Sequence, residues 1–307
     1  MIISASRRTD IPAFYSEWFY NRIREEYLLT RNPFNSNQVT KVNLNPFDVE
    51  CIVFWTKNPS PMMEKLDQIK EYKYYFHYTI TPYSSKYEPG TPALEERIET
   101  FIRLSEMIGK DKVIWRYDPI LLSDDIDIEF HARMFNKLAQ QLSTHTFRCI
   151  ISFIDMYKNT QRNTRDLHLW EMDDDTDRVI ARELVNIANH YNLELHTCAE
   201  RIDLSEMGIS HGKCIDNDII SRLLKKTINI PKDRNQREEC GCIKSLDIGA
   251  YNTCTHNCKY CYATNNQPSM DDCSKKHDPK SPFLIGDSSK NDIVSEKNKS
   301  GQTYIKL

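Results

Sequence analysis

Short apolar runs alternate with longer amphipathic stretches over most of the chain. The runs rich in Ile, Val, Phe and Tyr predict strands at Met1–Ser6, Cys51–Trp55, Tyr75–Ile80, Val113–Tyr117, Arg148–Phe153, Glu194–Cys198 and Ser245–Ala250. The stretches between them predict helices at Ala13–Tyr27, Met62–Glu71, Ala93–Met107, Glu129–Leu142, Asp175–His190 and Asn217–Leu224. Continuous apolar strands separated by helices indicate a parallel sheet built from βαβ units.

Such a sheet can curl into a barrel or stay open. The number of units predicts an α/β fold with a full or partial (β/α) barrel. The alternative is an open doubly wound sheet, but no Gly-rich turn follows the first strand. We expect one barrel domain over residues 1–263, including a cysteine-rich loop at 240–263. Residues 264–307, rich in Asn, Ser, Asp and Lys, predict a polar C-terminal tail that is mobile or lies along the surface.

The overall charge of the chain does not by itself identify a class of partner. The 307 residues carry a formal net charge of −3, so no general basic field indicates nucleic acid. No apolar run reaches the ~18–20 residues that span a bilayer. The first strand, followed by Arg7 and Arg8, is too short for a signal peptide. We therefore expect a cytoplasmic protein with no membrane partner.

The chain contains ten cysteines, and their distribution is uneven. In a cytoplasmic protein a disulfide framework is disfavoured, which leaves buried thiols or metal ligands. Three lie inside apolar runs and are predicted to be buried free thiols: Cys51, Cys149 and Cys198. Five others fall within 22 residues of polar sequence: Cys240, Cys242, Cys254, Cys258 and Cys261. Clustering of this kind predicts a metal site.

Cys254, Cys258 and Cys261 are spaced C-x3-C-x2-C, with Tyr260 directly before the third cysteine. A [4Fe–4S] cluster needs four thiolates for complete ligation by protein, so three thiolates leave one iron open to a cofactor or substrate. We expect these three cysteines to bind such a cluster. A structural zinc site of the Cys3His type, using His256, is the competing interpretation, although the position of His256 inside the loop gives poor tetrahedral geometry.

Cys240-Gly-Cys242 lies just before this loop. The pair is either an auxiliary metal site or a pair of structural thiols, and we favour the metal site. It would need further ligands, and the available cysteines are Cys214 and Cys273.

Charged residues recur directly after the predicted strands. In a parallel barrel these strand ends share one face, which carries the active site, so we expect a shared pocket for a charged ligand. The cations that could bind a carboxylate or phosphate are Arg7, Arg8, Lys57 and Arg116, near Asp10. The carboxylates also allow a metal-dependent barrel hydrolase, with ligands from Asp10, Asp118, Asp155 and Glu200.

The cysteine spacing together with Tyr260 resembles the radical SAM motif. Further segments resemble the DUF1848 family, over nearly the whole chain up to about Ala263: Ser6–Pro12, Phe54–Pro59, Trp115–Pro119, Cys198–Glu200 and Arg237–Gly249. The radical SAM resemblance implies S-adenosylmethionine as a cofactor and an external electron donor. It also implies a 5′-deoxyadenosyl radical that abstracts hydrogen from a substrate, with Tyr260 shielding the cluster or packing on adenine. DUF1848 brings no established reaction with it.

The position of the motif differs from the usual one, because radical SAM proteins carry it after their first strand. The order of other segments is nonetheless similar to spore photoproduct lyase and its relatives: Thr9–Tyr15, Thr56–Lys57, Glu88–Pro92 and Arg116–Pro119. This implies a circular permutation in which Ser245–Ala250 lies parallel to Met1–Ser6. The similarity to spore photoproduct lyase also implies a phosphate-bearing or nucleic-acid substrate. A non-enzymatic iron–sulfur or zinc module is the alternative function.

Overall fold

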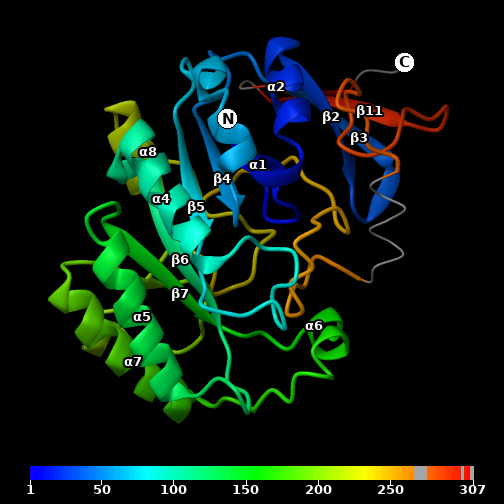
Figure 1. The fold of residues 1–307 in the computed structure, drawn as a ribbon. Coiled ribbons are helices and arrows are strands. Elements are labelled where there is room, and N and C mark those ends of the chain that lie inside the picture. Colours follow the sequence, from blue (N-terminus) through cyan, green and yellow to red (C-terminus); the bar gives the residue numbers. More distant parts are fainter. Residues whose placement is uncertain (266–274, 299–300, 305–307) are drawn as a thin grey trace.

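An all-parallel sheet of eight strands forms the centre of the computed structural model, which describes residues 1–265, 275–298 and 301–304 (Figure 1). Its strand order is β10-β1-β4-β5-β6-β7-β8-β9. The strands are β1 (Ile2–Ala5), β4 (Cys51–Thr56), β5 (Tyr74–Thr79), β6 (Val113–Ile120), β7 (Arg148–Phe153), β8 (Glu194–Thr197), β9 (Ser210–His211) and β10 (Leu246–Asp247).

Helices connect these strands, and α4, α5 and α7 lie along one side of the sheet (Figure 1). From β1 to β9 the strands follow one another in chain order, without the reversal that marks a doubly wound sheet. Within the described residues, no pairing joins β9 to β10, so the sheet stays open. The helices are α1 (Ile11–Phe14), α2 (Ser16–Arg24), α3 (Ser60–Met63), α4 (Leu94–Ile108), α5 (Ile128–Leu142), α6 (Lys158–Asn163), α7 (Asp174–His190) and α8 (Asn217–Leu224).

Both faces of the sheet are buried, as expected for parallel strands. On one face, Trp115 stacks on Phe135 of α5 in the main core, which also includes Phe76. On the other face, alternate strand residues pack against α8 and the segment 214–243, which fill this side: Ile2, Val53, Tyr75, Ile114 and Ile150. The predicted α/β fold is therefore confirmed, but within the described residues the sheet does not close into a full barrel.

Two predicted helices differ from the observed elements. The stretch Ala13–Tyr27 is divided at Tyr15, and α2 ends at Arg24, because Glu26 adopts a left-handed conformation with φ of 57°. The stretch Met62–Glu71 forms the short α3 and a 3₁₀ turn at Leu66–Ile69.

An antiparallel hairpin, not predicted from the sequence, follows α2. Its strands β2 (Tyr27–Asn32) and β3 (Asn35–Asn43) belong to a second sheet of four strands, β12-β11-β3-β2, with β11 (Ile293–Asn298) and β12 (Gly301–Tyr304). β11 runs parallel to β3, and Phe283 packs with Val39 and Val294. The Trp18 indole N–H also donates to the Ser281 carbonyl at 3.0 Å. The described part of the predicted tail is thus packed on the domain.

The parallel pair of β10 and β1 joins the end of the domain to its beginning. Ile3 lies opposite Leu246, and Ser4 lies opposite Asp247. The Asp247 carboxylate accepts hydrogen bonds from the Ser4 hydroxyl (2.8 Å), the Ser6 hydroxyl (2.6 Å) and the Arg7 backbone N–H (2.9 Å). The adjacency expected between Ser245–Ala250 and Met1–Ser6 is therefore observed. No helix among the described residues has both the length and the apolar character needed to cross a membrane.

We predict that Gly249→Ala destabilises this junction. A Cβ at Gly249 would lie 2.1 Å from the Ser6 Oγ and 2.6 Å from its Cβ, so β10 and β1 would be pushed apart. The free energy of unfolding, measured by urea denaturation, should fall by about 1–3 kcal/mol. Ser6→Gly removes the clashing atoms, so the double variant should lose less stability than the sum of the two single variants. Strict additivity would contradict the predicted clash.

Candidate functional site

Cys254, Cys258 and Cys261 lie in one loop that follows β10, at the carboxyl edge of the sheet. The Asn252 N–H donates to the Ala263 carbonyl at 3.0 Å and closes the base of the loop. The Tyr15 hydroxyl donates to the Thr253 carbonyl at 2.6 Å and fixes the loop to the segment between α1 and α2. The three thiols are free and partly exposed.

The three thiols influence one another electrostatically. Burial raises the pKa of Cys254 well above its ordinary value, and the neighbouring Asp10, Cys261 and Cys258 raise it further. Burial also raises the pKa of Cys258 to about 12, with a contribution from Cys261. The three predicted ligands therefore lie in one loop, near enough to influence one another electrostatically.

The part of the chain that the structure describes holds no group of three or more His, Cys, Asp or Glu side chains that could hold a single metal ion. A [4Fe–4S] cluster makes a different demand, because four irons and four sulfides hold their thiolates farther apart than one ion does. The absence of a ready single-ion site among the described residues therefore does not bear on a cluster.

The segment that follows β5 packs directly against the cysteine loop. The Lys259 N–H donates to the Tyr87 carbonyl at 2.9 Å, and the Gly90 N–H donates to the His256 carbonyl at 2.8 Å. A Cβ at Gly90 would lie 2.5 Å from the Thr255 carbonyl oxygen. Only glycine permits this close approach between the two backbones.

His256 is buried, and both of its ring nitrogens have oxygen partners. Nε2 lies 2.8 Å from Asp10 Oδ2, and Nδ1 lies 3.1 Å from the Gly90 carbonyl oxygen. The Asp10 carboxylate also accepts from the backbone N–H groups of Lys57 (2.7 Å) and Ala13 (2.9 Å). Asp10 thus fixes the loop, the end of β4 and the start of α1. A Cys3His zinc site in this loop lacks its histidine, because neither His256 nitrogen is available.

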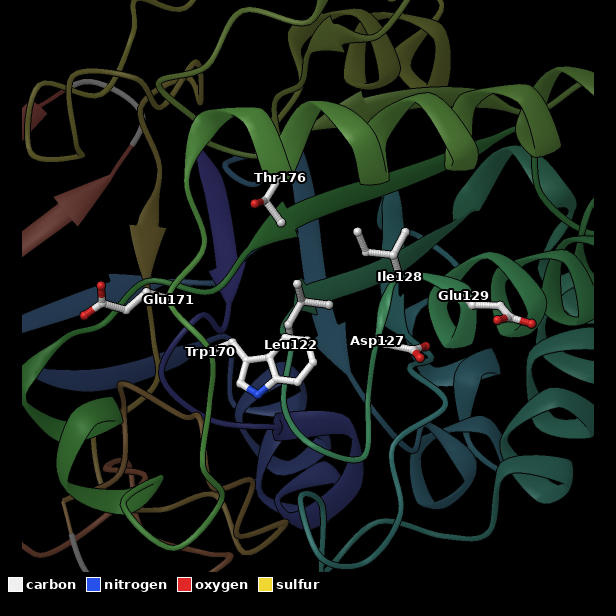
Figure 2. Close-up of a pocket in the computed structure, with 7 residues that line it drawn as sticks. All are labelled: Leu122, Asp127, Ile128, Glu129, Trp170, Glu171 and Thr176. Carbon is white, nitrogen blue, oxygen red and sulfur yellow. The ribbon is translucent and has the colours of Figure 1, made fainter.

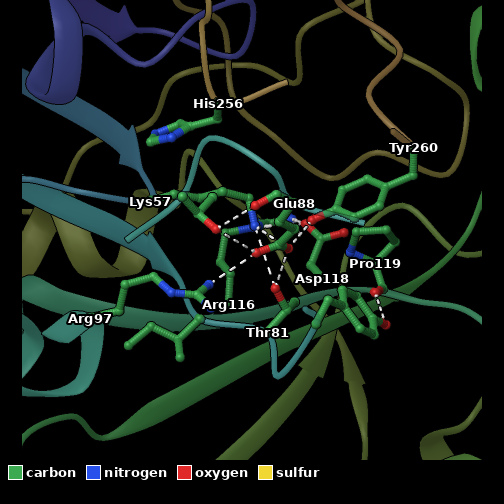
Figure 3. Close-up of polar contacts among 12 residues, drawn as sticks. Lys57, Thr81, Glu88, Arg97, Arg116, Asp118, Pro119, His256 and Tyr260 are labelled. Atoms are coloured by element: carbon green, nitrogen blue, oxygen red, sulfur yellow. Dashed lines mark hydrogen bonds and ion pairs between the residues drawn. The ribbon is translucent and has the colours of Figure 1, made fainter. Parts of the chain in front are cut away.

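Glu88 is buried at the centre of a charged network beneath the loop (Figure 3). Its carboxylate lies 2.9 Å from Lys57 Nζ and 3.0 Å from Arg97 Nη1, and it accepts hydrogen bonds from the Thr81 and Tyr260 hydroxyls. Burial alone would raise the pKa of Glu88, but Lys57, Arg97 and the two hydroxyls lower it below its ordinary value. Glu88 lies in the segment Glu88–Pro92, which carries part of the resemblance, but its carboxylate was not among the predicted site residues.

Tyr260 anchors the loop through this network. Its hydroxyl donates to Glu88, and its ring packs 6.1 Å from the Tyr83 ring, measured between centroids. The Lys57 ammonium lies 5.7 Å from the centroid of the Tyr260 ring. Lys57 and Tyr260, both predicted site residues, are therefore in contact beside the cysteine loop.

The three predicted arginines lie in two different parts of the structure. Arg8 lies beside the cysteine loop, with its guanidinium carbon 5.3 Å from the centroid of the Tyr251 ring and its Nε 4.0 Å from Asp247 Oδ1. Arg7 and Arg116 point to the face of the sheet that α8 covers. Arg116 Nη1 lies 2.8 Å from the Cys214 sulfur, and its other nitrogens pair with Asp118.

Residues 2–263 match the family model described as a domain of unknown function, DUF1848. The chain belongs to this family. No curated protein matches the chain, and no solved structure does. The match includes the cysteine loop and the Glu88 network, and it ends at Ala263, whose carbonyl closes the loop.

A second group of cysteines lies inside the DUF1848 domain, beneath Arg7. Cys240 and Cys242 lie close to Cys214, one of the two partners expected for them. The other expected partner, Cys273, lies outside the described residues. Cys198 joins the group, with its sulfur 3.2 Å from the Cys214 sulfur. Cys51, Cys149 and Cys198 were predicted to be buried free thiols; all three are free, and Cys198 is half-buried whereas the other two are buried.

The four carboxylates of the hydrolase alternative each have a partner of their own in the DUF1848 domain. Asp10 pairs with His256, Asp118 with Arg116, and Asp155 with Arg237. Glu200 accepts from the Phe153 N–H at 3.0 Å, and burial raises its pKa to about 8. These pairings leave no shared carboxylate site for a metal ion within the described residues.

Figure 2 shows a pocket in the DUF1848 domain that none of the predicted site residues lines. It lies around the starts of α5 and α7 and is lined by Leu122, Asp127, Ile128, Glu129, Trp170, Glu171 and Thr176.

Replacing Glu88 should destabilise the domain strongly. Glu88→Gln leaves Lys57 and Arg97 without their buried counter-charge, so the free energy of unfolding should fall by about 3–5 kcal/mol at neutral pH. Because the pKa of Glu88 is lowered, its contribution is complete above its ordinary value of 4.5 and is lost as the pH falls through the lowered value. The difference between variant and parent should therefore shrink in acid.

Glu95→Gln is the matched control for this measurement. Glu95 lies on the exposed surface of α4, with its carboxylate 3.5 Å from Lys137 Nζ. Its replacement should leave urea denaturation close to that of the parent. Equal losses in the two variants would contradict a special role for Glu88.

Proposed function

We propose that this DUF1848 domain binds a [4Fe–4S] cluster through Cys254, Cys258 and Cys261 and binds S-adenosylmethionine at the open iron. On this proposal it is a radical SAM enzyme with a substrate still to be identified. One observation carries the proposal: three free thiols share a closed loop at the carboxyl edge of an in-order parallel sheet. Ligands of parallel α/β sheets bind at this edge.

The chain's own residues have supporting roles in this chemistry. When bound, the cluster supplies a single electron for cleavage of a carbon–sulfur bond in S-adenosylmethionine, and an external electron donor must reduce it. Tyr260, Glu88 and Lys57 hold the loop that carries the thiols. Arg8, partly exposed beside Tyr251, is the cation best placed to bind the carboxylate of S-adenosylmethionine.

The strand order supports a circular permutation as the origin of this arrangement. β10 is the last strand of the parallel sheet in sequence, yet it occupies one edge beside β1. The cysteine loop thus follows an edge strand, and the next strand in the sheet is the first in the chain. A permuted chain requires only that its original ends lie close together.

Spectroscopy on anaerobically purified protein tests the cluster. The parent should contain iron and, after reduction, give an electron paramagnetic resonance signal of a [4Fe–4S]⁺ cluster that changes when S-adenosylmethionine is added. Cys254→Ser/Cys258→Ser/Cys261→Ser should lose this signal, whereas Cys51→Ala, which removes a buried thiol elsewhere in the core, should retain it. A signal that does not respond to S-adenosylmethionine would favour a non-enzymatic electron-transfer module. A parent without iron would refute the cluster.

Arg8→Gln should weaken S-adenosylmethionine binding and leave the cluster in place. A charge-assisted contact to the carboxylate contributes about 1.5–3 kcal/mol, so the dissociation constant should rise roughly ten- to hundredfold. Iron content should not change. Arg182→Gln on the exposed side of α7 is the control and should bind as the parent does. Release of 5′-deoxyadenosine by the reduced enzyme gives a second readout, and equal affinities in both variants would remove Arg8 from the site.

A further inference from the structure

We propose that Cys198 and Cys214 form a reversible disulfide when the domain meets a low-molecular-weight disulfide as oxidant. The two cysteines lie on the face of the sheet that α8 covers, apart from the cysteine loop that follows β10. The modification would place a redox-sensitive cross-link inside the DUF1848 domain. The inference does not depend on the proposed radical SAM activity.

The fold brings together two cysteines that are 16 residues apart in the chain. β8 ends at Thr197, directly before Cys198, and the Gly212 N–H donates to the Thr197 carbonyl at 2.7 Å. A Cβ at Gly212 would lie 2.5 Å from that carbonyl oxygen, so glycine permits the close approach. The chain that leads to Cys214 is therefore held against the end of β8.

The sulfur atoms of the pair are already in contact. Cys198 Sγ lies 3.2 Å from Cys214 Sγ, and both thiols are free. A disulfide bond joins its two sulfurs at about 2.05 Å, so the atoms need to approach by only about 1 Å. Rotation of the two side chains can supply this shift without moving the strands.

Hydrogen bonds hold the backbone on both sides of the pair. The Cys214 carbonyl accepts from the Tyr75 hydroxyl at 2.6 Å and lies 2.7 Å from His77 Nε2. The Cys198 N–H donates to the Ile151 carbonyl at 2.9 Å. Both cysteines are thus positioned before any oxidation, and a disulfide would tie the end of β8 to the segment that leads into α8.

Cys242 is the competing partner for Cys214. The Cys242 sulfur accepts from the Ile215 N–H at 3.4 Å, and its side chain is buried. Cys198 is half-buried, so an oxidant reaches Cys198 before it reaches Cys242. Access therefore favours the disulfide between Cys198 and Cys214.

The charges around the pair indicate how fast it should react. Arg116 Nη1 lies 2.8 Å from the Cys214 sulfur, and a nearby cation favours the thiolate, which is the form that attacks a disulfide. The hydrogen bond to Cys214 and burial raise the pKa of Cys198 well above its ordinary value, although Arg116 lowers it. The hydrogen bond from Cys198 lowers the pKa of Cys214, but Cys242 and burial raise it to about 11. Both thiols are therefore mostly protonated at neutral pH, and oxidation should take minutes to hours.

The oxidation proceeds by two thiol–disulfide exchanges. Cys198 loses its proton and attacks one sulfur of the oxidant, whose S–S bond breaks and releases one thiol after that thiol takes up a proton. Cys214 then loses its proton, attacks the Cys198 sulfur and releases the second thiol. Two protein thiols are thereby oxidised to one disulfide, and one molecule of oxidant is reduced to two thiols.

Glutathione disulfide tests the pair in Cys254→Ser/Cys258→Ser/Cys261→Ser, which lacks the loop thiols. Trypsin cleaves after Lys and Arg, so it places Cys198 in peptide 183–201, Cys214 in peptide 214–222, and Cys240 and Cys242 together in peptide 238–244. After incubation for several hours, mass spectrometry should find peptides 183–201 and 214–222 joined by a disulfide. Dithiothreitol should separate them again and restore both free thiols.

Adding Cys149→Ala to this variant is the matched control. It removes a buried thiol on the opposite face of the sheet and should leave the cross-link unchanged. Adding Cys198→Ser should abolish the joined peptides. The mapping is repeated on the parent chain, so the test does not rest on the folding of any one variant.

Three results would overturn the inference. Cys198 and Cys214 could both remain free thiols after the incubation, Cys214 could instead be joined to peptide 238–244, or Cys198 could stop at a mixed disulfide with glutathione. The triple variant lacks the three proposed cluster ligands, and the cluster signal is measured separately on the parent protein. Failure of the disulfide and failure of the proposed function are therefore distinguishable.

Discussion

The candidate site depends on the hydrogen bonds that the Asp247 carboxylate accepts. It accepts hydrogen bonds from Ser4, Ser6 and the Arg7 backbone, and so fixes the short β10 along β1. Two residues of strand pairing would hold a loop weakly without such side-chain bonds. Because the cysteine loop starts a few residues later, its position relative to Arg8 and the other strand ends follows from this junction.

Two buried carboxylates then hold the loop itself. Asp10 binds His256, and Glu88 binds Tyr260, so each contacts a residue between two of the three cysteines. Buried carboxylates are costly unless they are paired and hydrogen-bonded, and both of these are. The loop has little regular structure, and its shape is set by these contacts and by the backbone pairing of residues 87–90. The cysteines themselves are left partly exposed at the edge of the sheet.

The sequence predicted what depends on local pattern. Apolar periodicity located the strands of the parallel sheet, and cysteine spacing located the loop. The hairpin at 27–43 was missed because most of β3 is exposed or half-exposed and shows no regular alternation. Glu88 was missed because its partner Tyr260 is 172 residues away in the chain.

The junction between β1 and β10 has a consequence for synthesis of the chain. Ser4 and Asp247 are 243 residues apart, so β1 leaves the ribosome long before its edge partner exists. Until then its outer edge has free backbone groups of the kind that invite pairing with other chains. The same order applies to the cysteine loop, because Cys261 is among the last residues of the matched domain to be made. Any cofactor held by that loop must be loaded onto a domain whose other strands have already been synthesised.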